Sequence, residues 1–309
     1  MLMPSWFTTY MDHKPARFGT LLALAGILVL TPDTLVIRLS GLERWTLMGW
    51  RGLLMGAMLF AIWWVLFTRQ PWRELRTIVT WQGFIVIGTF SLNSVTFTLG
   101  IVETSASVVL TAVATMPVFA AILSAILLQE RQGWLGWSTI FAAMSGVGIV
   151  VANGSSATGQ PDGSVILGGL YGMLTAIGLA VTFTFARKYP WLAILPAAAF
   201  GAFISGIIGL SLAEQDKIFD VPFWTVLVMG LILLPVSFTC LNLAPRYISA
   251  AVVSLVMLLE MVIGPFWVWI GIGERPSVIM MGGTAIVLAA LSFHIIRTQW
   301  FAASQRNAD

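Results

Sequence analysis

The sequence contains few charged residues. Asp, Glu, Lys and Arg make up 9% of the 309 residues, whereas ordinary soluble domains carry roughly 25%. Hydrophobic residues make up 58% of the chain. A soluble fold of this length cannot bury so much apolar surface, so the composition predicts an integral membrane protein. The net charge of +3 gives no polybasic signature, and we expect no nucleic-acid partner.

Several kinds of chemistry are also missing from the sequence. The single cysteine, Cys240, excludes an internal disulfide, and the chain has only two histidines, His13 and His294. We therefore expect no metal site and no cofactor. The sequence lacks a Walker A loop and the HExxH and GxSxG motifs of hydrolases, so it predicts neither ATP binding of that type nor an enzyme.

Long apolar runs are abundant instead. A spanning helix needs about 20 apolar residues, and continuous runs of this length favour helices over a barrel, whose strands alternate. The sequence thus predicts an all-α integral membrane protein with ten transmembrane helices. The expected spans are residues 18–39, 45–67, 81–101, 105–128, 134–152, 164–186, 191–213, 223–243, 247–271 and 277–297.

The distribution of Lys and Arg predicts the orientation. With the N-terminus in the cytoplasm, eleven of these residues fall in inside segments, three in outside segments and two within spans, which accounts for all 16. This bias predicts cytoplasmic termini in a bacterial-type inner membrane. The N-terminal residues show no cleavable signal pattern, so we expect the first span to direct insertion.

Two segments match in register when the chain is shifted by 144 positions. Residues 105–131 and 249–275 share eight identical positions out of 27, and both end in a Glu-Arg pair. Each half holds five spans, and an odd number forces opposite orientations, so we expect two inverted five-helix repeats. The expected divisions are a cytoplasmic segment 1–17, a first repeat 18–152, a linker 153–163, a second repeat 164–297 and a cytoplasmic tail 298–309.

The two Glu-Arg pairs, Glu130-Arg131 and Glu274-Arg275, end corresponding helices of the repeats. The Arg cation suits a helix C-terminus, and the Glu can accept from free amides at the start of the next helix. A structural role is the favoured interpretation, and a gating salt bridge is the alternative.

These pairs follow Met116-Pro117 in the first half and Glu260-Met261 in the second. A fourth helix with a Glu-Pro step, ending in G/L-E-R, is typical of the EamA-type branch of the drug/metabolite transporter superfamily. The sequence resembles that branch over nearly its whole length, although here the Glu-Pro step is split between the halves. The resemblance implies transport of a small metabolite, with export of amino acids, including aromatic ones, among the activities of similar proteins.

Ionisable groups within spans are the first candidates for a transport site. Glu260 lies near the middle of its span, where it could take up a proton or bind a substrate amine. The alternative is a protonated side chain that bonds to a neighbouring helix. Asp33 follows the helix-breaking Pro32, and its alternative role is a local cap or ion pair. Arg51 either extends toward the surface or pairs with Asp33 or a substrate carboxylate.

Weaker candidates are polar residues within spans, which join helices more often than they bind solutes. They are Asn93, Asn242, Thr111, Thr115 and Ser254. Trp267 belongs to an aromatic run that could stack on an apolar or aromatic solute, and a lipid-facing position is the alternative. Prolines within spans predict helix hinges. They are Pro32, Pro117 and Pro265. The small-residue steps at 52–56, 168–172 and 205–209 predict close helix contacts.

The sequence therefore predicts a secondary active transporter that moves a small metabolite outward by alternating access, with an amino acid as the favoured class. A channel or facilitative pore is the alternative, and an intramembrane enzyme is a weaker one. The expected partners are a small-molecule substrate and the lipid bilayer, and the expected assembly is a monomer or homodimer.

Overall fold

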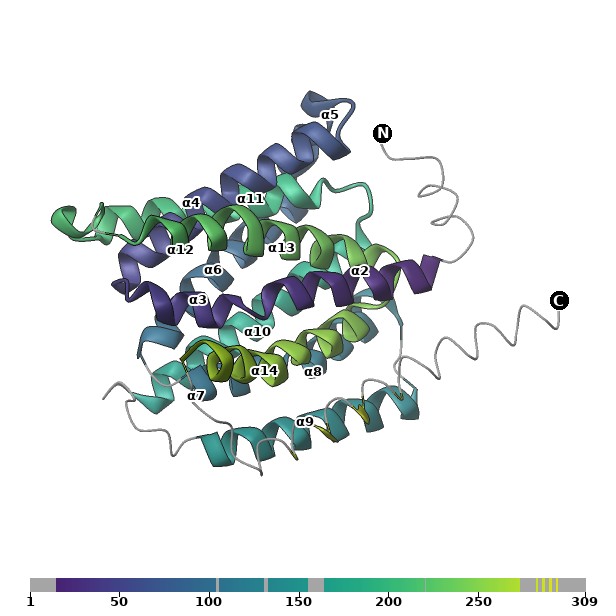
Figure 1. Ribbon diagram of the computed structural model, residues 1–309. Coiled ribbons are helices and arrows are strands. Elements are labelled where there is room, and N and C mark those ends of the chain that lie inside the picture. The colour runs from purple at the N-terminus through teal and green to yellow at the C-terminus, as the bar shows by residue number, and fades with distance from the viewer. Residues whose placement is uncertain are drawn as a thin grey trace.

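The computed structural model describes residues 15–103, 106–130, 133–154, 164–219, 221–272 and a few positions between 282 and 293. All regular structure in these residues is helical (Figure 1). The helices of the first half are α2 (Pro15–Leu30), α3 (Asp33–Ser40), α4 (Arg44–Ile62), η1 (Trp63–Phe67), α5 (Pro71–Ile78), α6 (Trp81–Glu103), α7 (Ala106–Val113), α8 (Met116–Leu123), η2 (Ser124–Leu128) and α9 (Trp134–Gly154). Those of the second half are α10 (Val165–Lys188), α11 (Ile194–Leu212), η3 (Gln215–Lys217), α12 (Phe223–Leu227), η4 (Val228–Leu233), α13 (Leu234–Leu243), η5 (Ala244–Arg246) and α14 (Ala250–Ile272).

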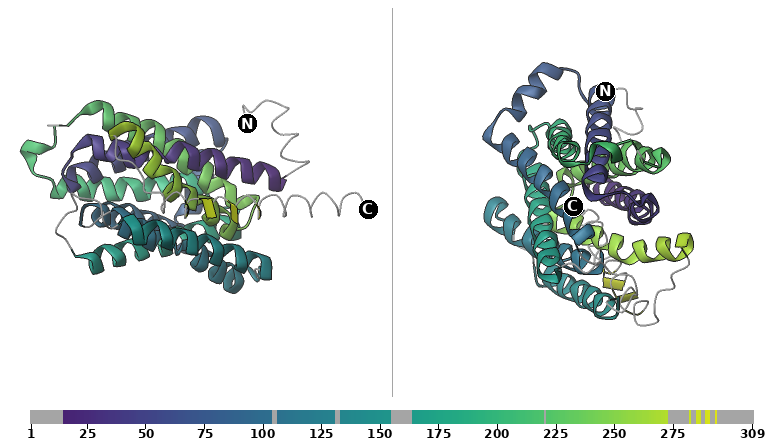
Figure 2. Two further views of the ribbon diagram at one scale, coloured as in Figure 1. Left: turned by 60° about the horizontal axis from the view of Figure 1, so that its bottom comes forward. Right: turned by 90° about the vertical axis from the view of Figure 1, so that its left-hand side faces the viewer.

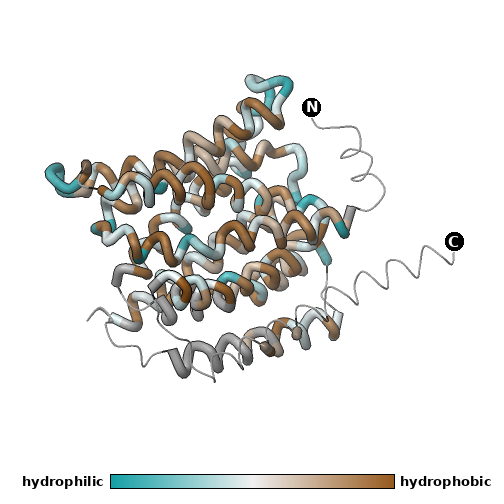
Figure 3. The backbone as a smooth tube through the Cα atoms, viewed as in Figure 1, coloured by the Kyte–Doolittle hydropathy of each residue, from teal (hydrophilic) through white to brown (hydrophobic). Residues whose placement is uncertain are grey.

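The helical segments are apolar along most of their length and hydrophilic at the turns that join them (Figure 3). Within the described residues, six helical segments are long and apolar enough to cross a membrane. They are Ala16–Ser40, Arg44–Phe67, Trp81–Ile101, Ile166–Lys188, Ile194–Leu212 and Phe223–Arg246. The protein is therefore an all-helical, multi-pass membrane protein.

These six segments coincide with six of the ten expected spans. Helices also cover most of the expected spans 105–128, 134–152 and 247–271, the last of them only from Ala250. Most of 277–297 lies outside the described residues. The expected start of span 191–213 was too early, because a turn in which the Leu192 amide donates to the Tyr189 carbonyl (3.0 Å) delays the helix until Ile194. The count of ten spans and the inverted repeat stay predictions.

Two of the three proline positions coincide with interrupted helices. Pro32 separates α2 from α3, because proline has no N–H to donate to the carbonyl of Leu28 four residues earlier. The hydroxyl of Thr31 donates to that carbonyl instead, at 3.0 Å. A similar break after α7 precedes Pro117, whereas α14 continues through Pro265 without interruption.

Helices α4 and α11 lie side by side along small residues. A Cβ atom added at Gly52 would lie 2.5 Å from the backbone nitrogen of Gly206, and one added at Gly206 would lie 2.6 Å from the nitrogen of Leu53. The small-residue steps at 52–56 and 205–209 therefore contact each other, which brings the two halves of the chain to backbone contact. Figure 2 shows the bundle from two further sides, and its end-on view shows most helices running along one direction.

Candidate functional site

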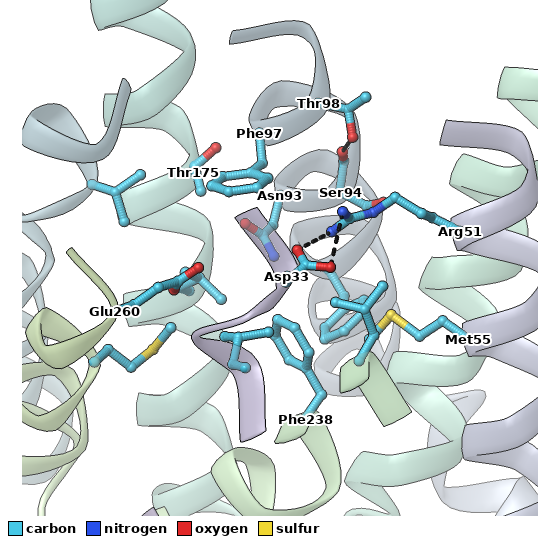
Figure 4. A pocket seen from close by; sticks show the side chains of 16 residues that line it. Asp33, Arg51, Met55, Asn93, Ser94, Phe97, Thr98, Thr175, Phe238 and Glu260 are labelled. Carbon is cyan, nitrogen blue, oxygen red and sulfur yellow. Dashed lines mark hydrogen bonds and ion pairs between the residues drawn. The ribbon is translucent and has the colours of Figure 1, made fainter. Parts of the chain in front are cut away.

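A cavity lies inside the bundle, between helices of both halves of the chain (Figure 4). Its volume is about 60 Å³. Its polar lining comes from α3, α4, α6, α10 and α14, and consists of Asp33, Arg51, Asn93, Ser94, Thr98, Thr175 and Glu260. Its apolar lining is Leu30, Met55, Phe90, Phe97, Val113, Leu179, Leu234, Phe238 and Met257. Of the residues expected at a transport site, Glu260, Asp33, Arg51 and Asn93 thus share one cavity.

Asp33 and Arg51 form a buried ion pair on one side of this cavity. Arg51 Nη2 lies 3.0 Å from Asp33 Oδ2, and Arg51 Nη1 donates to Asp33 Oδ1 at 3.2 Å. Arg51 is only 8% exposed and Asp33 only 2%. The break at Pro32 places Asp33 at the first position of α3, from which its carboxylate reaches across to α4. Two parallel bonds give the pair a fixed geometry and cancel the two charges locally.

Glu260 enters the cavity from α14, on the opposite side from Arg51 (Figure 4). Within the described part of the chain, its carboxyl group has neither a hydrogen-bond nor an ion-pair partner. The cavity thus contains one ion pair with balanced charges and one carboxyl group without a balancing cation. A carboxyl group of this kind can exchange a proton or bind the amine of a solute.

One face of α6 supplies five of the lining residues. They are Phe90, Asn93, Ser94, Phe97 and Thr98. They recur at intervals of three and four residues, which places them on one side of a helix. The sequence analysis identified Asn93 alone from this group. The spacing of the polar members within span 81–101 was a signal that could have revealed the whole face.

Trp267 was a candidate for the site, but the aromatic rings that line the cavity are phenylalanines. Phe90 and Phe238 meet edge to face, with ring centroids 5.3 Å apart. Trp267 is instead the donor of a hydrogen bond from its Nε1 to Thr31 Oγ1, at 2.9 Å. That bond connects α14 to the break between α2 and α3, so Trp267 joins helices in this structure.

The remaining polar candidates lie away from the cavity lining. Thr115 and Ser254 donate to carbonyls of their own helices, those of Ala112 (2.6 Å) and Ala251 (2.8 Å). Asn242 is fully buried, and both polar atoms of its amide lack a partner among the described residues. It follows Leu234 and Phe238 at four-residue intervals, so it extends the cavity-lining face of α13 by one turn.

Some predicted site residues cannot be placed. The side chain of Thr111 and the residues Arg131, Glu274 and Arg275 lie outside what the structure describes. Among the residues that it does describe, no group of three His, Cys, Asp or Glu side chains is arranged to hold a metal ion.

Glu130 belongs to a network of charged groups that connects three helix ends. Arg187, in the last turn of α10, lies 3.2 Å from Glu130 Oε1 through its Nη2. Arg187 Nη1 also donates to the carbonyl of Arg246 at 3.1 Å. Arg246 Nη2 in turn donates to the carbonyl of Leu192 at 2.9 Å. The partner of Glu130 is thus a residue of the second half of the chain.

Comparisons with known proteins agree with this architecture. Residues 17–152 match the EamA-like transporter family. The sequence has no match among curated proteins. A solved structure titled "Crystal structure of protein" is 13% identical, with a TM-score of 0.73 over 90% of this chain and 96% of that chain. At that identity the likeness shows a shared fold alone. The first half of this multi-pass membrane protein therefore matches transporters of small solutes rather than enzymes.

Proposed function

We propose that the protein is a secondary active transporter that moves an amino acid outward across a bacterial-type inner membrane by alternating access. The observation that supports this most directly is the central cavity, in which Glu260 faces the Asp33–Arg51 ion pair. Solute sites at the midplane, between two halves of a chain, are typical of secondary transporters.

The helix contacts support the proposed inverted repeat. Shifting the chain by 144 positions relates α2–α3 to α10, α4 to α11, α6 to α12–α13, and α7–α8 to α14. In the structure α10 packs on α6, α7 and α8, while α2 packs on α13 and α14. The two sets of contacts exchange under the shift, and α4 packs on its own counterpart α11. A pseudo-two-fold axis produces this pattern of reciprocal contacts.

The chemistry of the cavity favours a zwitterionic solute with an apolar side chain. The carboxyl group of Glu260 offers a partner for an ammonium group, and the guanidinium of Arg51 offers a partner for a carboxylate. Phe90, Phe97 and Phe238 supply apolar surface for the remainder of the solute. An aromatic amino acid combines these three features.

The size of the cavity indicates that a solute requires a rearrangement to enter. The volume of about 60 Å³ is room for only a few water molecules, each of which needs at least about 10–15 Å³. The Glu130–Arg187 ion pair joins the two halves of the chain. Arg187 lies in α10, and Arg246 lies in η5, which follows α13 directly. Each is about two helical turns beyond the last cavity-lining residue of its segment, Leu179 or Phe238. We therefore assign this network as a gate that opens during the transport cycle.

Counterflow in proteoliposomes tests the proposal. The purified protein should exchange a labelled amino acid for an unlabelled one with saturable kinetics, and a panel of amino acids would identify the preferred side chain. Repeating the assay with and without a pH gradient would show whether protons drive net movement.

The same assay separates the alternatives. A channel or facilitative pore would give flux that does not saturate and shows no counterflow. An intramembrane enzyme would alter its substrate chemically. Either result would contradict the proposed transport mechanism.

A further inference from the structure

A second cavity lies between α5 with the residues just before it and the turn that joins α10 to α11. Its volume is about 490 Å³, and it is lined by Arg69, Gln70, Arg73, Glu74, Thr77 and Trp191. Ligand pockets typically measure about 300–1,000 Å³. The cavity shares no lining residue with the central one, so the transport site does not account for it.

The charges around this second cavity favour an anion. Arg69 and Arg73 are exposed, and neither forms an ion pair within the described part of the chain. Arg73 Nη1 donates to Gln70 Oε1 at 3.4 Å, which leaves the other N–H groups of this guanidinium without a side-chain partner in the described part of the chain. The acidic lining residue, Glu74, is engaged elsewhere, because its Oε2 accepts from Trp63 Nε1 at 2.7 Å. The two guanidinium groups outnumber the one carboxylate of the lining, and guanidinium groups are well suited to bind a phosphate.

The surroundings of the cavity indicate that the phosphate belongs to a lipid. Trp72 is 75% exposed and Trp191 is 51% exposed, as expected for side chains at the level of lipid headgroups. Immediately before this loop, the exposed side chains of Trp64, Val65 and Leu66 provide an apolar surface at the end of a spanning helix. A molecule with both a phosphate and acyl chains can contact the arginines and this apolar surface at once.

We propose that the cavity lined by Arg69, Arg73 and Trp191 binds the headgroup of an anionic phospholipid, whose acyl chains lie along the exposed apolar end of the preceding helix. Such a lipid contacts both halves of the chain, because Trp191 belongs to the second half. The halves already meet at this point, where Thr77 Oγ1 accepts from the backbone amide of Ala193 at 3.1 Å. Bound lipid therefore stabilises the contact between the halves, whether or not a solute is being transported.

Binding can be measured on the full-length protein in detergent by native mass spectrometry and by thermal unfolding. The probes are phosphatidylglycerol and, for comparison, phosphatidylcholine. We expect phosphatidylglycerol to bind preferentially and to raise the Tm. Arg73→Gln removes one guanidinium from the cavity and should weaken phosphatidylglycerol binding about fivefold, with Arg69→Gln acting in the same direction.

Arg76→Gln is the matched control, since it removes the same charge from the same helix at a position that does not line the cavity. It should change binding by less than about twofold. Equal losses in the Arg73 and Arg76 variants would show a diffuse attraction to negative charge and overturn the site. Equal binding of the two lipids would also overturn it, as would displacement of the lipid by millimolar inorganic phosphate. The Tm of each variant in phosphatidylcholine verifies that it is folded.

Discussion

Glu260 is the ionisable side chain of the central cavity whose charge no described residue balances. Its counterpart in the first half, after a shift of 144 positions, is Met116. A carboxyl group that served only to support a symmetric scaffold would not require this asymmetry. The charged groups that face it are those of Asp33 and Arg51, which balance each other. We therefore propose Glu260 as the residue that binds a proton or a solute amine.

The first prediction concerns proton coupling at this residue. Glu260→Gln keeps the size and hydrogen-bonding capacity of the side chain but cannot ionise. We expect the variant to lose transport driven by a pH gradient, while exchange of solute for solute survives. Both modes can be measured in the same proteoliposomes.

Two other outcomes would reject coupling through Glu260. Loss of both modes together with loss of solute binding would assign the residue to the solute amine instead. Wild-type rates in both modes, in a variant that is folded and well expressed, would show that the carboxyl group is structural.

The second prediction concerns the Asp33–Arg51 ion pair. Removing one member of a buried pair leaves an uncompensated charge, so Asp33→Asn and Arg51→Met should each reduce stability by about 3 kcal/mol or more. The double variant should lose less than the sum of the two single variants, because it leaves no unpaired charge. Unfolding of the purified proteins in detergent measures the stability of the two single variants and the double variant. Strictly additive losses would show that Asp33 and Arg51 do not stabilise each other.

At the scale of the helix, the close contact between α4 and α11 depends on the absence of a side chain at Gly52. Our third prediction is that Gly52→Ala lowers stability by about 1–3 kcal/mol, because the added methyl group would overlap the backbone of Gly206. Gly88→Ala is the control, since a Cβ atom there meets nothing within 4 Å. Thermal unfolding compares the two, and equal stability would show that the helices can separate without cost.

The helices themselves could be predicted from the sequence to a large extent, because a run of about 20 apolar residues has few other structures available to it. The face of each helix that lines the cavity could not be predicted from the sequence. In a membrane, an apolar residue suits a lipid-facing or an interior position equally well, so Phe90 and Phe238 gave no signal as lining residues. Contacts between distant segments, such as Trp267 with Thr31, depend on packing that one sequence does not specify.

The ion pairs could be predicted from the sequence only in part. Pairing of Arg51 with Asp33 was one of the alternatives that the sequence raised, because charges within spans require partners. The partner of Glu130 could not be derived in the same way, since Arg187 lies 57 positions further along the chain. Its neighbour Arg131 was the only cation suggested by the sequence pattern.

At the scale of the whole molecule, the inverted repeat makes a prediction about topology. If the two halves have opposite orientations, Arg131 lies at the cytoplasmic face and Arg275 at the outer face. Single-cysteine variants at these positions, in a Cys240→Ala background, should therefore react differently with an impermeant thiol reagent added from outside. We expect labelling of Arg275→Cys alone, and equal labelling at both positions would reject the inverted repeat.

The last prediction concerns the gate between the halves. In the structure the Glu130–Arg187 pair is formed. Asn242 is fully buried in α13, between Phe238, which lines the cavity, and Arg246, whose carbonyl accepts from Arg187. Asn242→Cys, again in a Cys240→Ala background, should therefore react slowly with impermeant thiol reagents. Adding Glu130→Gln removes the charge that holds Arg187, so the gate should open more often. Labelling of Asn242→Cys should then accelerate in inside-out vesicles, which expose the proposed cytoplasmic face.

Lys217→Gln is a suitable control, because it breaks an exposed ion pair with Glu214 at the opposite end of α11. It should leave the labelling rate unchanged. Faster labelling from the outer face, or the same acceleration in the control, would mean that the Glu130 network does not separate the cavity from the cytoplasm. Faster labelling from the cytoplasmic face alone would mean that the central cavity extends along α13, past Phe238, when the Glu130–Arg187 pair opens. A solute released from Glu260 would then reach Asn242 next.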